Sequence, residues 1–168
     1  QIVGPSLVVY NKTQLQDFLR WAKSNGVLPT IVSWHELAFG PQTVEPDVAE
    51  TRAFLQANGM GNLRVSLNEF VNQANQSKPG PVTQFLGAVE RSGVQGAVKT
   101  SFIENGVRIN NNLNGLLTAD QKPRSAYWAF KGYADVTGTL VKVFPSASIN
   151  GVAGRDPVRK EARAVLGQ

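Results

Sequence analysis

Polar side chains that could carry chemistry follow three apolar segments, each at the point where a strand would end. Trp34-His35-Glu36 closes the first segment, Asn68-Glu69-Phe70 the second and Thr100-Ser101-Phe102 the third. In α/β folds, polar groups at the C-terminal ends of adjacent parallel strands point into one shared pocket. We therefore expect a functional site at these strand ends.

Glu69 is the candidate catalytic residue. If its strand keeps a period of two, Val65, Leu67 and Glu69 share one side, so a carboxylate ends an otherwise apolar face. Such a group must be solvated, hydrogen-bonded or in use. Glycoside hydrolysis needs two carboxylates, one as proton donor and the other as nucleophile or activator of water. Glu69 could be one of them; the alternative is an ordinary solvated residue that opens the next loop.

His35 is the only histidine of the chain. It cannot form a zinc site that requires several histidines, and no G-x-S-x-G nucleophile elbow accompanies it. We expect it to donate a hydrogen bond to a substrate or to Glu69. Trp34 is either a core residue or a platform for stacking a sugar, and the core is the safer interpretation. Because side chains alternate along a strand, only one of His35 and Glu36 is expected to enter the pocket.

The elements that must position these residues follow a strand–helix pattern repeated four times. Strands are expected to start near residues 2, 30, 63 and 94, a spacing of roughly thirty residues, typical of βα units with a parallel sheet. The expected helices start at a capping box of Thr13 and Gln16, near Pro46 and at Pro81. Gly26, Gly59 and Gly93 are expected to end them.

The pattern changes after the fourth strand, which is expected over residues 94–102. Asn105-Gly106 suits the tight turn of a hairpin, and a helix is expected from about Arg124 to Asp135. Short strands are then expected over 139–144, 148–152 and 163–166. The chain would thus divide into an α/β region, residues 1–137, and a β-strand-rich segment, residues 138–168.

Four βα units do not close a barrel, since an eight-unit barrel typically needs about 250 residues and this chain has 168. The fold class is therefore α/β, either as an open doubly wound sheet or as half of something larger. The first residue is Gln1, so we expect the natural N-terminus, and any targeting signal with it, to be missing.

Composition excludes several function classes. The chain has no cysteine, which removes disulfides, thiolate metal sites and cysteine nucleophiles. No apolar run is long enough to cross a bilayer, so no membrane partner is expected. The formal net charge is +5, but the basic residues near the end alternate with Asp156 and Glu161. We interpret them as a solvated surface and expect no nucleic-acid partner.

The order of several motifs resembles clan A glycoside hydrolases, most closely glycoside hydrolase family 39 and its uncharacterised relatives. These motifs are GPS at 4–6, SWHEL at 33–37, VSLNEF at 65–70, PGPVTQFLGAVERSGVQGAV at 79–98 and GLLTADQKPRSAYWAFKGYADVTG at 115–138. The resemblance covers nearly the whole chain. It implies that the four strands are strands five to eight of a (β/α)₈ TIM barrel, followed by the start of a small β-sandwich.

The same resemblance implies roles for individual residues. Glu69 matches the nucleophile of a retaining enzyme and His35 matches a histidine of the sixth strand, while Asn68, Trp34 and Glu36 are expected to contact the substrate. The family's general acid ends strand four, which this chain lacks, so the chain alone is expected to be inactive. The implied partners are a carbohydrate substrate and the missing N-terminal half of the same barrel, with no metal or organic cofactor, in a secreted protein.

Three alternatives stay open on the sequence. A non-catalytic carbohydrate-binding or structural relative would bind a glycan in the same pocket. A complete doubly wound domain would hold a different ligand at its switch point. A half-barrel that dimerises would bring two copies of Glu69 together. A half-barrel is also expected to expose a large apolar surface on its open side.

Overall fold

The computed structural model describes residues 1–100, 103–104, 107–108 and 113–168. Its first half is a four-stranded parallel sheet in the order β1-β2-β3-β4, formed by Val3–Leu7, Ile31–Glu36, Arg64–Phe70 and Gly96–Ala97. Helices α1 (Lys12–Ser24), α2 (Val44–Ala57) and α3 (Pro79–Ser92) connect them. Neighbouring strands are consecutive in the chain, so the sheet has no reversal of strand order, which a doubly wound sheet requires at its switch point.

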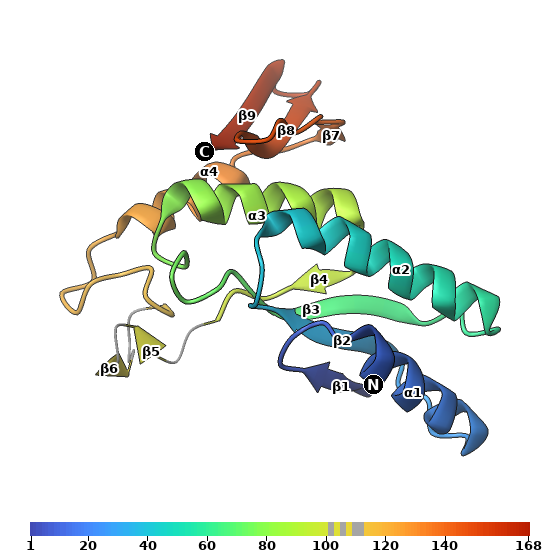
Figure 1. The fold of residues 1–168 in the computed structure, drawn as a ribbon. Coiled ribbons are helices and arrows are strands. Elements are labelled where there is room, and N and C mark those ends of the chain that lie inside the picture. The colour runs from blue at the N-terminus through green and yellow to red at the C-terminus, as the bar shows by residue number, and fades with distance from the viewer. Residues whose placement is uncertain (101–102, 105–106, 109–112) are drawn as a thin grey trace.

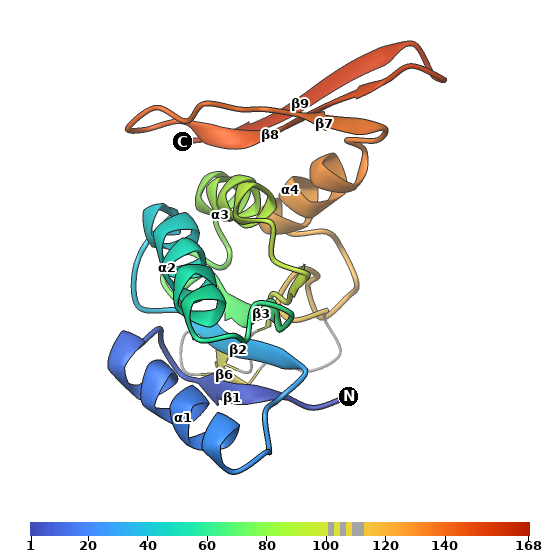
Figure 2. The same ribbon diagram turned by 90° about the vertical axis from the view of Figure 1, so that its right-hand side faces the viewer.

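The helices and the sheet bury one hydrophobic core between them (Figure 1, Figure 2). Trp34, Phe85, Leu19 and Leu67 are at most 1% exposed, and they come from β2, α3, α1 and β3. The helices follow one another around a single side of the sheet (Figure 2). Burial of these large side chains against one face explains why each strand is followed by an amphipathic helix.

Helix ends agree with the sequence in part. Gly93 ends α3 in the left-handed conformation, with φ of 65°, as expected for a C-terminal glycine. Helix α1, however, is capped by Asn11, whose side chain accepts a hydrogen bond from the backbone N–H of Gln14 at 3.0 Å. The expected capping box of Thr13 and Gln16 was wrong because Asn11 already caps the helix two residues earlier.

The fourth strand is shorter than expected. Only Gly96 and Ala97 pair with β3. The backbone amides of the flanking Gln95 and Val98 each donate one further hydrogen bond to a carbonyl oxygen of β3. Beyond it, the pairing of β5 (Ile103–Glu104) with β6 (Val107–Arg108) confirms the hairpin. Its turn residues, Asn105-Gly106, and the strand end at Ser101-Phe102 lie outside the described residues.

The last part of the chain forms a separate three-stranded antiparallel sheet, with order β7-β8-β9. Helix α4 (Ser125–Ala134) leads into β7 (Thr139–Val141), β8 (Asn150–Asp156) and β9 (Glu161–Gly167). This sheet lies over α3 and α4 (Figure 2). Among the described residues, no helix is long and apolar enough to cross a membrane.

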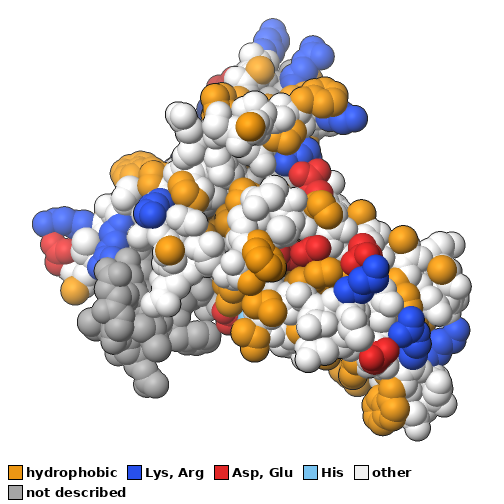
Figure 3. All heavy atoms as spheres, in the orientation of Figure 1, with side chains coloured by type: hydrophobic (Ala, Val, Ile, Leu, Met, Phe, Trp, Pro, Cys, Tyr) orange, Lys and Arg blue, Asp and Glu red, His pale blue; other side chains and the backbone are white. Residues whose placement is uncertain are grey.

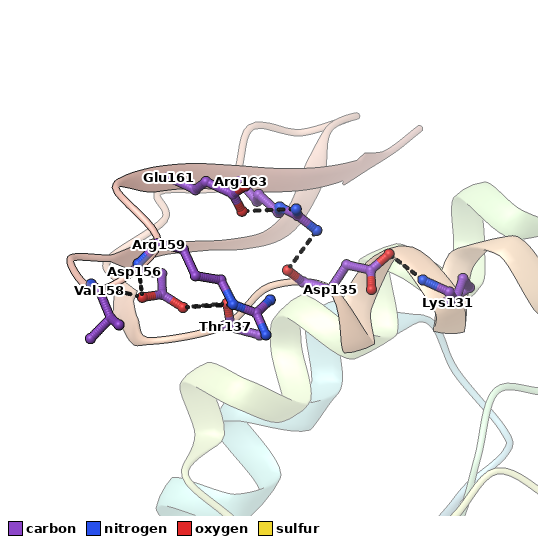
Figure 4. Close-up of polar contacts among 8 residues, drawn as sticks. All are labelled: Lys131, Asp135, Thr137, Asp156, Val158, Arg159, Glu161 and Arg163. Carbon is purple, nitrogen blue, oxygen red and sulfur yellow. Dashed lines mark hydrogen bonds and ion pairs between the residues drawn. The ribbon is translucent and has the colours of Figure 1, made fainter.

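Acidic and basic side chains interleave at the β8–β9 hairpin, as the sequence predicted (Figure 4). Asp156 accepts hydrogen bonds from Thr137 and from the amides of Val158 and Arg159. Arg163 pairs with Glu161 at 2.8 Å and donates to the carbonyl oxygen of Asp135 at 3.3 Å. These bonds tie the hairpin to the end of α4. Lys and Arg side chains accordingly gather over this sheet in Figure 3.

Close backbone contact holds the three-stranded sheet against α3. A Cβ atom added at Gly87 would lie 2.5 Å from the carbonyl oxygen of Gly151, so only glycine lets α3 approach β8 at this point. Arg91 of the same helix donates to the side chain of Asn150 at 2.8 Å. The contact between α3 and β8 therefore combines a glycine, which allows close approach of the backbones, with a hydrogen bond from Arg91.

Replacing Gly87 by valine should separate α3 from β8. We expect Gly87→Val to lower the free energy of unfolding by about 2 kcal/mol, because overpacking forces backbone shifts. Urea unfolding measures the change. Gly96→Val is the matched control, since a Cβ there meets nothing nearer than the Ser66 hydroxyl at 3.9 Å. Equal losses in the two variants would contradict the assigned contact.

Candidate active site

A shift in register between β2 and β3 arranges the candidate site. Trp34 pairs with Leu67 but the next residue, His35, pairs with Glu69, so Asn68 is an extra residue in β3. Such a bulge interrupts the alternation of side chains. Val65, Leu67 and Phe70 lie in the hydrophobic core, whereas Asn68 and Glu69 both contact residues of the opposite face. The expectation that Val65, Leu67 and Glu69 share a side was therefore wrong.

His35 and Glu69 face each other at the C-terminal ends of these two strands. Their closest atoms, His35 Nδ1 and Glu69 Oε2, are 3.8 Å apart, and their side chains are 17% and 22% exposed. The distance is longer than a hydrogen bond but is within ion-pair range if the imidazole is protonated. The pair is thus close enough to interact and open enough to meet a ligand.

Asn68 joins three strands beneath this pair. Its amide Nδ2 donates to the Ser6 hydroxyl at 2.7 Å and lies 3.3 Å from the Ser33 hydroxyl. The two serine hydroxyls are 3.1 Å from each other, and Ser33 is fully buried. The Asn68 amide is therefore hydrogen-bonded within the protein. Its role in this structure is to hold β1, β2 and β3 together next to Glu69.

The face opposite the helices is polar rather than apolar. Ser6, Ser33 and Asn68 occupy it, so the large apolar surface expected for the open side of a half-barrel is absent from its described centre. The exposed apolar side chains lie at the sheet edges instead, where Val3 at the start of β1 is 45% exposed and Val98 after β4 is 55% exposed. The edges, and not the face, carry the apolar exposure.

Backbone strain occurs two residues after the candidate nucleophile, Glu69. Val71 has φ of 71° and is 1% exposed. Positive φ is a genuine outlier for a β-branched residue, and such strain costs of order 1–3 kcal/mol and clusters at functional sites. No pattern in the sequence signals this strain, because valine is an ordinary strand residue.

Trp34 and Glu36 lie on the helix-facing side of β2, away from His35. Trp34 is fully buried and Glu36 is 3% exposed, and the indole Nε1 of Trp34 donates to Glu36 Oε1 at 2.6 Å. Thr43 donates to the other carboxylate oxygen at 3.2 Å. The structure therefore brings His35, Asn68 and Glu69 together and leaves Trp34 and Glu36 behind the sheet.

Asp47 of α2 is a further acid that the sequence did not single out. Burial raises the pKa of Asp47 to about 7, and the nearby carboxylates of Glu36 and Glu50 add to the increase. Burial also raises the pKa of Glu36, against the lowering effect of its hydrogen bonds to Trp34, Thr43 and Asp47. Each acid therefore acts on the pKa of the other, and burial favours the protonated form of Asp47.

Several cavities lie elsewhere in the described part of the chain. One of about 190 Å³ lies where α3 meets β7 and β8, and one of about 270 Å³ lies between the start of α2, α3 and the loop before β8. Another of about 330 Å³ lies at the β8–β9 hairpin, and one of about 430 Å³ lies beside β4. His35 and Glu69 line none of these four. Within the described ranges, no group of three or more His, Asp and Glu side chains could hold a metal ion.

Two curated proteins are similar to this chain over nearly all of it. A 3-O-alpha-D-galactosyl-alpha-L-arabinofuranosidase of Bifidobacterium longum subsp. longum is 27% identical over 99% of the chain. A 3-O-beta-L-arabinopyranosyl-alpha-L-arabinofuranosidase of Bifidobacterium pseudocatenulatum is 26% identical over the same share. The chain spans only 15% and 17% of these proteins. No family model matches.

Solved structures share the fold. N2152 from Neocallimastix frontalis superposes with a TM-score of 0.85 at 28% identity, over 98% of this chain and 41% of that one. A glucosidase from Croceicoccus marinus gives 0.74 at 14% identity, covering 98% and 38%. A monomeric beta-xylosidase from Caulobacter crescentus CB15 gives 0.60 at 16%, covering 92% and 36%. The chain is therefore related to glycoside hydrolases, and it corresponds to a segment of each of these larger proteins.

Removing the Asn68 amide should weaken the junction of the three strands. We expect Asn68→Ala to lower the free energy of unfolding by about 1–3 kcal/mol, because buried hydroxyls lose a hydrogen-bond partner. Urea unfolding measures it. Asn62→Ala, at an exposed turn position, should change stability by less than about 0.5 kcal/mol. A loss at Asn68 no larger than that at Asn62 would refute the assigned role.

The pKa of Asp47 predicts how stability depends on pH. Folded Asp47 keeps its proton up to about pH 7, while an ordinary aspartate loses it near 3.8. The folded state therefore binds more protons in this window, and the free energy of unfolding should fall as pH rises through it. Asp47→Asn should flatten this decline in unfolding curves measured across that range. Asp17→Asn is the control at an exposed acid of α1, and it should leave the decline of the free energy of unfolding in place. If Asp47→Asn also left this decline unchanged, the raised pKa of Asp47 would be contradicted.

Proposed function

We propose that this chain is the C-terminal half of a (β/α)₈ barrel in a retaining glycoside hydrolase, with Glu69 as its nucleophile. The observation that carries the proposal is the pairing of His35 with Glu69 at the C-terminal ends of β2 and β3. Barrel enzymes keep their catalytic groups at this end of the strands. The strained backbone at Val71 and the similarity to glycosidases both support it.

In this mechanism the Glu69 carboxylate attacks the anomeric carbon, and the bond to the leaving oxygen breaks as a glycosyl-enzyme ester forms. A carboxylic acid from outside this chain protonates the leaving oxygen, then takes a proton from the water that releases the sugar. His35 donates a hydrogen bond to a sugar hydroxyl or to Glu69, and Asn68 fixes the strand end. No metal or organic cofactor takes part.

The two edges of the sheet support a missing half of the barrel. Among the described residues, β1 and β4 each pair with one strand only. Beside β4 lies the cavity of about 430 Å³, which is lined in part by Phe70, Leu86 and Phe130. Side chains of a further βα unit would fill this cavity and cover the exposed Val98. We propose that the N-terminal half of the same barrel supplies both edges.

The remaining assignments follow from this proposal. Residues 1–137 would belong to the catalytic barrel, and residues 138–168 would begin a β-sandwich-like module. The substrate would be a plant or microbial polysaccharide or oligosaccharide, handled by a secreted enzyme most similar to glycoside hydrolase family 39. Because both curated relatives are named arabinofuranosidases, α-L-arabinofuranosides are the first substrates to test.

A non-catalytic carbohydrate-binding protein is the second candidate. In its favour, the partner that the structure gives the Glu69 carboxylate is His35 and not a second carboxylate. The two candidates differ in what a completed barrel does: an enzyme turns a glycoside over, whereas a binding protein retains it unchanged.

The isolated chain should not hydrolyse 4-nitrophenyl α-L-arabinofuranoside, because the proton donor and half of the barrel are missing. A chimera that joins Gln1 to the part of the Neocallimastix frontalis protein that precedes its matching segment should hydrolyse a glycoside, tested first with 4-nitrophenyl α-L-arabinofuranoside. In that chimera, Glu69→Ala should reduce kcat by roughly a thousandfold or more. Sodium azide should restore turnover and give a glycosyl azide of inverted configuration.

Glu45→Ala is the control. Glu45 lies away from the site and forms an ion pair with Arg91 at a distance of 2.8 Å. Equal activity of Glu69→Ala and Glu45→Ala would exclude Glu69 as the nucleophile. A folded chimera that binds arabinosides with no turnover would favour the binding protein.

A further inference from the structure

Glu36 is a buried carboxylate that the proposed chemistry does not use. It is 3% exposed, and burying a charge is costly unless it is well paired. Both of its oxygens are hydrogen-bonded, one to the indole of Trp34 and the other to Thr43. A hydrophobic residue would fill this place in an ordinary core at lower cost. Glu36 follows His35 directly in the chain, so the presence of a buried acid at this position requires an explanation.

The groups that face Glu36 come from three elements. Trp34 lies on β2 itself, Thr43 is the last residue of the short helix η1 (Pro41–Thr43), and Asp47 lies in the first turn of α2. Behind them, the Tyr10 ring contacts Trp34 with centroids 5.2 Å apart. The Tyr10 hydroxyl donates to Glu50 at 2.9 Å, and Lys12 pairs with the same acid at 2.6 Å. Glu36 thus connects the end of β2 to the start of α2, and Trp34 connects it in turn to Tyr10 in the segment before α1.

This connection bears directly on His35. Successive side chains of a strand point to opposite faces, so holding Glu36 on the helix side sets the direction of His35 on the polar side. The register shift lies between Trp34 and His35, and Glu36 pairs with Phe70 just beyond it. The strand is therefore clamped on both sides of the shift, by Trp34 and by Glu36, and these two residues also bind each other.

We propose that Glu36 is a positioning residue, which is held by Trp34, Thr43 and Asp47 and thereby fixes the direction in which His35 faces Glu69. The role in catalysis rests on the proposed function, whereas the coupling of Glu36 to His35 is a property of this chain alone. Asp47 supplies the proton that lets the two acids lie together. When Asp47 ionises, repulsion between the carboxylates loosens the clamp.

The chain offers two natural reporters for this coupling. His35 is the only histidine, so its ring resonances in an NMR spectrum are unambiguous. Of the three tryptophans, Trp21 and Trp128 are each 60% exposed and Trp34 is fully buried. The Trp34 indole N–H signal can be assigned by its slow hydrogen exchange and by its disappearance in Trp34→Phe.

The first test follows the Trp34 indole signal of the whole chain as a function of pH. We expect a step with its midpoint near pH 7, where Asp47 titrates, and we expect Asp47→Asn to abolish it. Glu50→Gln is the matched control on the same helix, and it should keep the step but move it to lower pH, because it removes a negative charge near Asp47. A step that persists in Asp47→Asn, or that is missing from the wild type, would overturn the shared-proton arrangement.

The second test measures the His35 ring resonances at one fixed pH. We expect Glu36→Ala to displace them and Glu36→Gln to restore most of the displacement, because the amide oxygen still accepts from Trp34. Resonances unchanged in Glu36→Ala, or no restoration in Glu36→Gln, would refute the positioning role. If Glu36→Ala does not fold, the His35 resonances of the wild type and of Glu36→Gln are compared with those of Asp47→Asn at pH values above and below the step of the Trp34 signal. The positioning role is refuted if the resonances of the wild type and of Asp47→Asn differ by the same amount on both sides of that step.

These measurements need no enzyme activity, so the two proposals can fail separately. A positive NMR result with an inactive chimera would leave the coupling standing and reject the glycosidase. If Glu69→Ala loses activity and azide restores it, but both NMR tests give the contradicting result, only the coupling of Glu36 to His35 is rejected.

Discussion

One extra residue in β3 determines what the rest of the site can be. Because Asn68 is inserted between the partners of Trp34 and His35, the strand turns Glu69 onto the polar face while Leu67 and Phe70 remain in the core. Without the bulge, alternation would bury the Glu69 carboxylate among apolar side chains of the helix layer, at a cost of several kcal/mol. The bulge thus lets a strand keep its hydrophobic anchor on one face and present an acid on the other.

The two faces of the sheet solve different problems. The helix side is packed with large apolar residues, and the buried carboxylate of Glu36 has both oxygens hydrogen-bonded. The other side carries the hydroxyls of Ser6 and Ser33 and the amide of Asn68, which are small enough to bond one another across three strands. A rigid network of this kind can hold reacting groups with little reorganisation, as electrostatic catalysis requires. On the helix side, close packing at Gly87 holds the three-stranded sheet against α3.

Features that depend on local sequence could be predicted, and features that depend on pairing between strands could not. The roughly thirty-residue repeat gave the parallel sheet, Gly93 gave the end of α3, and Asn105-Gly106 pointed to the hairpin that β5 and β6 form. Strict alternation failed at Asn68 because a bulge is set by the partner strand and leaves no mark in the pattern of apolar residues. For the same reason β4 was overestimated: its apolar sequence has a pairing partner on only one edge. The proximity of His35 to Glu69 could be expected from their strand ends, whereas the link from Glu36 to Asp47 required the packing of α2 on the sheet.

The central claim is that Glu69 is the residue that bonds to the sugar, and covalent trapping tests it most directly. The completed barrel would be incubated with an activated 2-deoxy-2-fluoro glycoside, whose glycosyl-enzyme ester turns over slowly, and the digested protein mapped by mass spectrometry. The account predicts one added sugar on the peptide that contains Glu69, and no label after Glu69→Gln. A stable label on any other carboxylate, with Glu69 unmodified, would contradict it.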